Sequence, residues 1–411
     1  MSKIEELIEK LCPNGVEWKE LGELGNFFSG LNGKSKKDFE NGNEKFITYM
    51  NVFSNLELDT DIVDKVFISE NEKQNSLSCG DIIFTGSSEI REECGMSSVL
   101  IKQTFEKLFL NSFCFGFRFY DGNIMLPKFS KYLFRSNFMR KQIIKTSSGV
   151  TRFNVSREKM KQIKTPIPPL EIQEEIVHIL DSFTELTAEL TAELTARRKQ
   201  YEFYRDSLLT FGDEVEWKEL GEVCNNVCSG GTPPSGKSDY YGGEIPWLRT
   251  QEINFNDIHD TEIKITELGL KNSSAKYIHK NCVIIAMYGA TVGKVAINKI
   301  PLTTNQACCN LEINGDIAVY RYVFYWLSNQ YGYIKSLGQG SQTNINSKIV
   351  KQLIIPIPPL SEQERIVSIL DKFDKLCNDI SEGLPAEIEA RKKQYEYYRD
   401  KLLNFEELKK S

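Results

Sequence analysis

The chain contains few histidines. Only His178, His259 and His279 occur among its 411 residues, and they are scattered along the sequence. A nucleophilic triad needs a histidine beside its nucleophile, held in place by a third group. Three isolated histidines support no such arrangement, so the composition argues against a hydrolytic triad.

Motifs for common cofactors are missing or incomplete. The stretch Gly289–Val295 resembles a phosphate-binding loop, but it is one residue short, and Val295 stands where Ser or Thr would bind magnesium. The chain has no glycine fingerprint for a dinucleotide or methyl donor, and no Asn/Asp-Pro-Pro-aromatic tetrad for base amino-methylation. Two cysteine pairs lack the further ligands that zinc requires: Cys224 with Cys228, and Cys308 with Cys309. We therefore expect a non-catalytic chain that binds no metal or cofactor itself.

Long apolar runs are also absent. None reaches the roughly 18 residues of a membrane span, and the segment 1–6 has no apolar signal core, so we expect a cytoplasmic protein without membrane contact. The ten cysteines form no regular framework, as is typical of reduced thiols. The net charge of −6 argues, as an average, against nucleic acid. Part of this charge, however, comes from residues 171–193, which carry seven acids and no Lys or Arg.

The sequence is internally duplicated. The octapeptide Val16–Glu23 recurs identically as Val215–Glu222, and Pro166–Leu170 recurs as Pro356–Leu360. The segments that follow these two proline-rich stretches are also similar. Identity at this level across half the chain indicates duplication. Each half therefore reads as a globular domain, a proline-rich hinge and a long helix.

A four-residue repeat lies between the two halves. Thr187–Leu190 and Thr191–Leu194 both read Thr-Ala-Glu-Leu, and neither Gly nor Pro interrupts residues 171–211, which favours one long helix. One added repeat would lengthen that helix by about 6 Å and rotate its far end by roughly 40°, so the repeat is suited to setting a distance. The duplicate helix should break near residues 383–385, where Gly383 and Pro385 occur.

Apolar residues of both helices follow a seven-residue spacing. Such a narrow seam favours a partner helix, and the duplicate is the obvious partner, in an antiparallel pair. The alternative is an ordinary amphipathic helix that lies on its own domain. The seam of the second helix begins with Ile366, Leu370, Phe373, Cys377, Ile380 and Leu384.

We predict an α+β fold with two pseudo-repeated domains of mixed helix and sheet, joined by two long antiparallel coiled-coil helices. The predicted segments are a first domain over 1–165 with a short helix at 3–11, a spacer helix over 166–211, a second domain over 212–355 and a distal helix over 356–411. Strands are expected near 46–52, 81–84, 113–119, 247–249, 282–287 and 308–313. Helices are expected near 128–145 and 318–337.

Three matched pairs of loops are small, polar and basic: 29–37 with 229–237, 85–91 with 288–294, and 145–152 with 338–344. Such loops can approach a phosphate backbone closely and offer amide or guanidinium groups to base edges. The alternative is that they are ordinary surface loops. The candidate DNA-binding residues are Lys34, Lys36, Lys37, Ser87, Arg91, Arg140, Lys145, Ser147, Thr151, Arg152, Thr232, Lys237, Arg249, Tyr288, Lys294, Gln339, Gln342 and Asn344.

In its sequence motifs the chain resembles the specificity subunit of type I restriction–modification enzymes. The two Pro-Pro-Leu hinges and the helices after them carry the resemblance, most clearly in Pro358–Gln363. The first copy departs from that pattern at Glu171–Glu174. The central repeat is similar to a subgroup in which repeat number alters the spacer. In that subgroup the spacer residues would be Thr187, Leu190, Thr191 and Leu194.

The resemblance implies a division of labour in host defence. Each globular domain would be a target-recognition domain that reads one half of a bipartite, asymmetric site in double-stranded DNA. The helices would set the spacer and dock two methyltransferase subunits, and restriction/translocase subunits would join for cleavage. S-adenosylmethionine, ATP and magnesium would then belong to those partners.

The resemblance also implies circular pseudo-symmetry, with residues 402–408 beside residues 4–8. Two other interpretations stay open from the residues alone, namely a nuclease with a cryptic site and a protein-only scaffold. Recognition depends on loop placement and DNA shape, so the sequence predicts neither the recognised bases nor the spacer length.

Overall fold

The computed structural model describes residues 3–61, 63–338, 344–379 and 381–408. The chain divides into two compact units. The first comprises Met1–Leu190 with Ile388–Ser411, and the second comprises Thr191–Glu387. Among the described residues, none of the helices combines the length and apolar character that crossing a bilayer requires.

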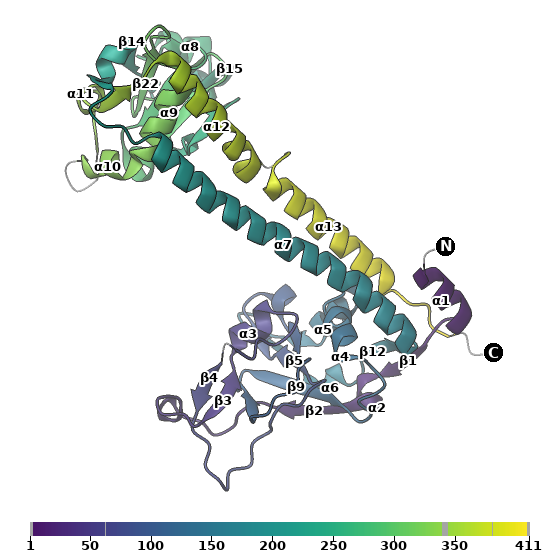
Figure 1. Cartoon of the computed structure of the whole chain (residues 1–411). Coiled ribbons are helices and arrows are strands. Elements are labelled where there is room, and N and C mark those ends of the chain that lie inside the picture. The colour runs from purple at the N-terminus through teal and green to yellow at the C-terminus, as the bar shows by residue number, and fades with distance from the viewer. Residues whose placement is uncertain (1–2, 62, 339–343, 380, 409–411) are drawn as a thin grey trace. The chain divides into compact units, whose positions relative to one another are not determined.

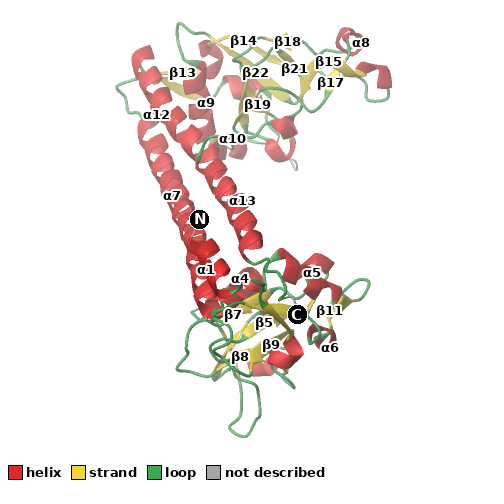
Figure 2. Cartoon of the chain, turned by 90° about the vertical axis from the view of Figure 1, so that its right-hand side faces the viewer, coloured by secondary structure: helices red, strands yellow, loops and turns green. Residues whose placement is uncertain are grey.

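The first unit contains a globular part with strands in four small sheets (Figures 1 and 2). Its strands are β1 (Glu17–Glu20), β2 (Gly25–Ser29), β3 (Glu44–Ile47), β4 (Asp64–Val66), β5 (Ile82–Thr85), β6 (Ser87–Ser88), β7 (Ser97–Val99), β8 (Leu108–Leu110), β9 (Cys114–Phe119), β10 (Ser147–Ser148), β11 (Phe153–Val155) and β12 (Lys164–Ile167). Its helices and 3-10 turns are α1 (Lys3–Leu11), α2 (Leu21–Leu24), η1 (Lys36–Phe39), α3 (Tyr49–Ser54), η2 (Arg91–Glu93), α4 (Pro127–Leu133), α5 (Asn137–Lys145) and α6 (Arg157–Met160).

The central sheet of this unit has the strand order β2-β9-β5-β7. Strand β5 reads Ile-Ile-Phe-Thr and is buried along its whole length, as β-branched and aromatic residues favour. Its Phe84 packs in one core with Phe117 of β9 and Phe129 of α4. Its Ile83 faces a second cluster with Ile47. The sheet is therefore covered on both faces.

The second unit repeats this plan with a larger sheet, β14-β22-β19-β20-β16, beside a four-stranded sheet, β17-β15-β21-β18. Its strands are β13 (Glu216–Glu219), β14 (Cys224–Ser229), β15 (Tyr241–Leu248), β16 (Asn256–Ile258), β17 (Lys264–Ile265), β18 (Tyr277–Ile278), β19 (Val283–Ala286), β20 (Val295–Asn298), β21 (Leu302–Thr304), β22 (Cys308–Ile313) and β23 (Ile354–Ile357). Its short helices and 3-10 turns are η3 (Leu220–Val223), η4 (Ser238–Tyr240), η5 (Thr250–Glu252), α8 (Glu267–Lys271), η6 (Gly289–Thr291), α9 (Tyr320–Asn329), α10 (Tyr331–Ser336) and α11 (Ser347–Lys351).

The duplicated octapeptide forms the same structure in both units. In the first, Trp18 of β1 pairs with Pro166 of β12. In the second, Trp217 of β13 pairs with Pro356 of β23. A capping box follows each strand, so the two identical sequences begin each domain with the same strand and turn.

The long helices pair within each unit. Helix α7 (Leu170–Leu208) is continuous and contributes to both units, while α12 (Leu360–Asn378) belongs to the second and α13 (Leu384–Leu402) mostly to the first. In the first unit Phe183 of α7 stacks on Tyr398 of α13. In the second unit Tyr201 and Tyr204 of α7 contact Phe373 of α12. Figure 1 shows α13 and α12 running beside α7 in the respective units.

The break in the distal helix lies where the sequence predicts it. Helix α12 ends at Asn378, and α13 begins at Leu384 with Pro385 in its first turn. A Cβ atom on Gly383 would lie 2.6 Å from the carbonyl oxygens of Lys375 and Asp379, so this position has no room for a side chain. The predicted seam residue Ile380 lies outside the described residues.

The two ends of the chain meet in the first unit, as the predicted pseudo-symmetry requires. The Val16 N–H donates to the Glu406 carbonyl at 2.9 Å, and the Leu408 N–H donates to the Val16 carbonyl at 2.8 Å. Leu403 is fully buried in the same core as Ile4. The predicted helix at 3–11 is α1.

Some predicted elements are wrong in extent. The expected strand at 46–52 ends at Ile47, because Thr48 caps the helix α3 through a hydrogen bond from the Asn51 N–H. The strand expected at 247–249 begins earlier, as β15. The helices expected at 128–145 and 318–337 are each divided in two, as α4 with α5 and as α9 with α10.

Candidate nucleic-acid interface

Two of the three predicted loops of the first unit meet in one small sheet. Its strand order is β10-β11-β6, in which Ser147 pairs with Val155 and Asn154 pairs with Ser87. This sheet joins the loop at 85–91 to the loop at 145–152. Polar side chains from distant parts of the sequence are thereby held on one edge of the domain.

Arg152 is the best-positioned basic residue of this edge. Its Nε–H donates to Ser87 Oγ at 3.0 Å, and its guanidinium carbon lies 5.8 Å from the centroid of the Phe113 ring. Arg152 is exposed to solvent. It lines a pocket of about 380 Å³ with Tyr49, Ser87, Ser88, Glu89, Ile90, Glu93 and Phe113.

The third predicted loop, at 29–37, lies near this edge only at its first residue. Ser29 stays close, since its Oγ accepts a hydrogen bond from Arg157 at 2.8 Å. Further along, Asn32 and Gln74 exchange two hydrogen bonds, which draw the loop toward residues 67–75. Lys36 and Lys37 are exposed in η1, on this separate segment. The structure therefore does not bring them together with Arg152.

Four predicted contact residues of the first unit have structural roles or little exposure. The Lys34 side chain is 7% exposed and bonds to Glu72 and the Phe67 carbonyl. Arg140 is 9% exposed and donates to the carbonyls of Glu92, Cys94 and Gly95, and burial lowers its pKa to about 10. Ser87 and Ser147 are buried. The charged groups of Lys34 and Arg140 are therefore bonded within the domain.

The remaining predicted residues of the first unit are exposed and basic or polar. This group comprises Lys36, Lys37, Arg91, Lys145, Thr151 and Arg152. Of these, Lys145, Thr151 and Arg152 lie in or beside the loop between α5 and β11, and Arg91 follows β6. Val150, in the same loop as Thr151, is 91% exposed and places an apolar side chain among them.

In the second unit the corresponding loops also converge at the end of β19. The Ile345 N–H donates to the Met287 carbonyl at 3.0 Å, as the Val155 N–H donates to the Gly86 carbonyl at 2.9 Å in the first unit. Tyr288 follows directly and is 39% exposed. The side chain of Asn344 turns inward, and its buried Oδ1 has no hydrogen-bond partner among the residues that the structure describes.

The other predicted residues of the second unit differ in how exposed they are and in how strongly they are bonded within the unit. Lys237 is exposed, and the Thr232 hydroxyl bonds to Gln306. Lys294 is half-buried and donates to Asn254 Oδ1 at 2.7 Å. Arg249 has a 22% exposed side chain that forms ion pairs with Glu252 and Glu262, so it is largely neutralised within the unit. Gln339 and Gln342 lie outside the described residues.

The sequence did not reveal how each globular part is attached to its helix. Gln173 near the start of α7 is fully buried. It accepts a hydrogen bond from the Leu126 N–H at 2.8 Å and donates to the carbonyls of Ile124 and Pro168. This single side chain therefore joins the helix, the proline-rich hinge and the residues before α4. We call it the glutamine clamp of the first unit.

The second unit has the same clamp. Gln363 is fully buried, accepts from the Val319 N–H at 2.9 Å, and donates to the carbonyls of Ile317 and Pro358. The sequence does show the two glutamines at matching positions, because each stands three residues after the leucine of a Pro-Pro-Leu hinge. Only the structure shows that they bond to the globular part.

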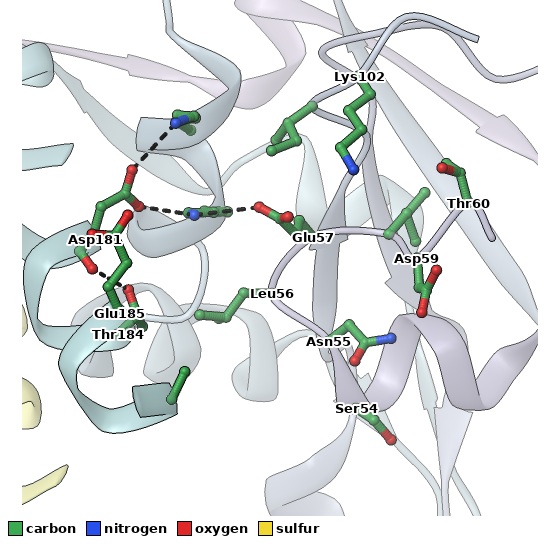
Figure 3. Close-up of a pocket in the computed structure, with 15 residues that line it drawn as sticks. Ser54, Asn55, Leu56, Glu57, Asp59, Thr60, Lys102, Asp181, Thr184 and Glu185 are labelled. Atoms are coloured by element: carbon green, nitrogen blue, oxygen red, sulfur yellow. Dashed lines mark hydrogen bonds and ion pairs between the residues drawn. The ribbon is translucent and has the colours of Figure 1, made fainter. Parts of the chain in front are cut away.

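In each unit a carboxylate about two helical turns after the clamp glutamine forms further bonds to the globular part. Asp181 of α7 accepts from the Tyr132 hydroxyl at 2.5 Å and pairs with Lys131 at 3.0 Å. Lys131 also forms an ion pair with Glu57, and all three residues line a pocket of about 640 Å³. Figure 3 shows Asp181 and Glu57 at this pocket. Burial alone would raise the pKa of Asp181, but the hydrogen bonds from Tyr132 and Lys131 lower it below the ordinary value.

The second unit uses an arginine in this place. Asp371 of α12 accepts from the Tyr325 hydroxyl at 2.5 Å and from Arg321 Nε at 2.6 Å. Arg321 also donates from one terminal nitrogen, Nη1, to both carboxylate oxygens of Asp257. Burial raises the pKa of nearby Asp374. In the part of the chain that the structure describes, no group of three or more His, Cys, Asp or Glu side chains could hold a metal ion.

Residues 13–197 and 212–390 each match the family of type I restriction modification DNA specificity domains. The chain belongs to this family. A type I restriction–modification specificity protein was predicted from the sequence, and the match confirms that prediction, together with two DNA specificity domains in one chain.

Two named relatives illustrate the similarity. The EcoR124I/EcoR124II specificity subunit of Escherichia coli is 44% identical over 265 residues, which are 61% of this chain and 65% of that subunit. A putative type I restriction enzyme specificity subunit of Haemophilus influenzae is 36% identical over 291 residues, which are 67% of this chain and 71% of that protein.

Solved structures show the same fold. A chain from a study of complex assembly in a type I R-M system has a TM-score of 0.66 at 19% identity, covering 96% of this chain and 99% of that one. The HsdS subunit from Thermoanaerobacter tengcongensis has a TM-score of 0.55 at 20% identity, covering 96% and 99%. The predicted fold class, with two pseudo-repeated α+β domains and long helices, is confirmed.

The central repeat, residues 187–194, lies on α7. Thr187, Leu190 and Leu194 are half-buried, whereas Thr191 is exposed. The Thr187 hydroxyl donates to the Phe183 carbonyl at 2.8 Å, within the helix. The repeat thus supplies a leucine seam along a helix without a break.

Proposed function

We propose that this chain is the non-catalytic DNA-specificity subunit of a type I restriction–modification complex. Each globular part reads one half of a bipartite, asymmetric site in double-stranded DNA. One observation carries the proposal: two duplicated DNA specificity domains are attached by identical glutamine clamps to a pair of long helices. Such an arrangement presents two different reading surfaces from one chain.

The exposed polar and basic residues described above make the DNA contacts. In the first domain these are Lys145, Thr151 and Arg152 with Arg91, and at a separate place Lys36 and Lys37. In the second they are Thr232, Lys237 and Tyr288, together with the half-buried Lys294. Lysines contact phosphates, which makes binding salt-dependent, while the loops approach the base edges.

The helices have two roles in this proposal. They dock two methyltransferase subunits, to which restriction/translocase subunits add. S-adenosylmethionine, ATP and magnesium bind to those partners. The Thr-Ala-Glu-Leu units on α7 set the spacer between half-sites, which places the chain in the repeat-containing subgroup. Because its substrate is cellular DNA, the complex acts in the cytoplasm.

Co-expression with the cognate methyltransferase tests the proposal. The purified complex should contain the chain and two methyltransferase subunits, and it should methylate one bipartite sequence in a DNA library. Methylation without sequence preference would refute the proposal, as would the same sequence preference in methyltransferase that lacks this chain.

A further inference from the structure

We infer that Arg152 reads a guanine in the half-site recognised by the first domain. The inference rests on the proposed function and adds the identity of one recognised base. A guanine offers O6 and N7 side by side in the major groove, and an arginine fork can donate to both at once.

The hydrogen bonding of Arg152 leaves this fork available. Its Nε–H is occupied by Ser87 Oγ at 3.0 Å. Among the residues that the structure describes, no acceptor is bonded to its two terminal nitrogens. The ring of Phe113 lies beside the guanidinium, 5.8 Å from its carbon. One edge of the group is therefore anchored, one face is supported, and the donors needed for guanine stay unused.

The anchors of Arg152 are themselves fixed. The Ser87 carbonyl accepts from the Tyr49 hydroxyl at 2.9 Å, and the residue is held in β6 by pairing with β11. The Phe113 carbonyl accepts from the Gly86 N–H at 2.8 Å, which ties the ring to the same strand. A side chain held in this way loses little conformational freedom on binding. Its fixed orientation can therefore distinguish one base from another.

The charge of the surroundings distinguishes a base from a phosphate. Glu89 and Glu93 line the same pocket as Arg152. Two carboxylates beside the guanidinium disfavour the approach of a phosphate, because like charges repel in a partly enclosed site. A guanine edge carries only partial negative charge, so the carboxylates oppose its approach much less. Lys145 lies outside this pocket lining and suits a phosphate better.

The second domain provides an internal reference. Counted back from the two Pro-Pro-Leu hinges, Gln342 is the residue of the second copy that matches Arg152. The bond from the Val155 N–H to the Gly86 carbonyl corresponds to the bond from the Ile345 N–H to the Met287 carbonyl, so Tyr288 has the structural position of Ser87. The arginine–serine pair thus occurs only in the first copy of this sequence position. A change at Arg152 should alter one half-site and leave the other as it was.

The test compares Arg152→Lys, Arg152→Ala and Lys145→Ala in the full chain, each co-expressed with the methyltransferase. Methylated sequences are mapped across the host genome, and binding of each complex is measured on DNA with each base at every half-site position. Arg152→Lys keeps the positive charge but removes the planar fork. Lys145→Ala removes a charge outside the pocket.

The wild-type complex should require a guanine at one position of one half-site. Both Arg152 variants should lose that preference by roughly ten- to a hundredfold, with the other half-site unchanged. Lys145→Ala should weaken binding to all sequences equally. Phe113→Leu should relax the same position to a smaller degree, because it removes the supporting ring and leaves the fork.

An unchanged base preference in Arg152→Lys would overturn the inference. A uniform loss of binding to all sequences in that variant would also overturn it, since that result identifies a phosphate contact. These outcomes differ from a failure of the proposed function, in which the wild-type complex itself shows no bipartite preference.

Discussion

At the scale of single residues, two arginines of the first domain show how the fold assigns roles. Arg140 is buried, and its guanidinium bonds to three carbonyls of the segment Glu92–Gly95. Arg152 is exposed, and among the described residues no acceptor is bonded to its two terminal nitrogens. Both are basic residues in a basic stretch, so composition alone cannot separate them. The difference arises from the turn after η2, which closes over Arg140.

Replacing Gln173 with Ala should destabilise the first unit. The change leaves the Leu126 N–H and the carbonyls of Ile124 and Pro168 without their buried partner, and each such loss costs roughly 1–3 kcal/mol. We expect a total loss of about 3 kcal/mol or more in the free energy of unfolding, measured by chemical denaturation of the full chain. Gln103→Ala, at an exposed position, serves as control and should change it by less than about 0.5 kcal/mol. Equal effects from both variants would contradict the clamp.

Asp181 should make the stability of the first unit sensitive to acid. Its pKa is lowered in the folded state, so its contribution is present above the unfolded value of about 4 and disappears as pH falls through the folded value. Asp181→Asn should cost about 1–3 kcal/mol at pH 7. The gap between variant and wild type should shrink below about pH 4.

Unfolding curves at pH 7 and pH 3 measure this difference. The exposed Asp61→Asn variant is the matched control and should give the same curves as wild type at both values. A cost for Asp181→Asn that is equal at both pH values would show that its effect does not depend on charge.

At the scale of elements, α7 is the part whose length matters most. It contains 39 residues without a break and contributes to both units. A four-residue unit corresponds to about 6 Å of rise and roughly 40° of rotation. One base pair corresponds to about 3.4 Å and roughly 34°. The rotations nearly match and the rises do not, so one repeat per base pair requires some bending of protein or DNA.

Deleting Thr191–Leu194 should shorten the gap between the recognised half-sites and leave both half-sites unchanged. Removing four residues turns the far domain by roughly 40°, which nearly matches the roughly 34° of one base pair, so each domain still faces the groove while the gap becomes shorter. Methylation mapping of the deletion variant measures the gap directly. A variant that methylates the original spacing would remove the repeat from the spacer role.

The distal helix contrasts with α7, because it is divided into α12 and α13. The break follows from Gly383 and Pro385, which the sequence shows directly. The division of each globular helix, by contrast, was missed. Helix α4 ends at Leu133 and α5 begins at Asn137, after the Ser136 hydroxyl bonds to the Leu133 carbonyl at 2.7 Å. Neither Gly nor Pro marks that point, so only tertiary packing identifies it.

At the scale of the whole molecule, duplication was the most informative property of the sequence. It predicted two domains, two hinges and two helices, because identical octapeptides such as Val16–Glu23 must fold alike in like surroundings. The resemblance to the specificity family implied that residues 402–408 lie beside residues 4–8, and Leu403 and Ile4 do share one core. Large repeated features of the sequence therefore predict the corresponding structural features well.

The candidate interface was predicted less completely. Loops at 85–91 and 145–152 were singled out as polar and basic, and the structure joins them in one sheet. The sequence could not show that Lys34 and Arg140 bond inside the domain, because those partners lie in distant loops. It also could not show that Ser87 and Phe113 hold Arg152. Such contacts depend on backbone pairing that no local pattern encodes.

The most direct test of the account is an exchange of the second domain. Residues 212–355 are replaced by the corresponding segment of another specificity subunit, and the chimera is co-expressed with the methyltransferase. Genome-wide methylation mapping then gives the recognised sequence. The account predicts that one half-site changes to that of the donor, while the other half-site stays the same. A chimera in which both half-sites change, or neither does, would contradict it.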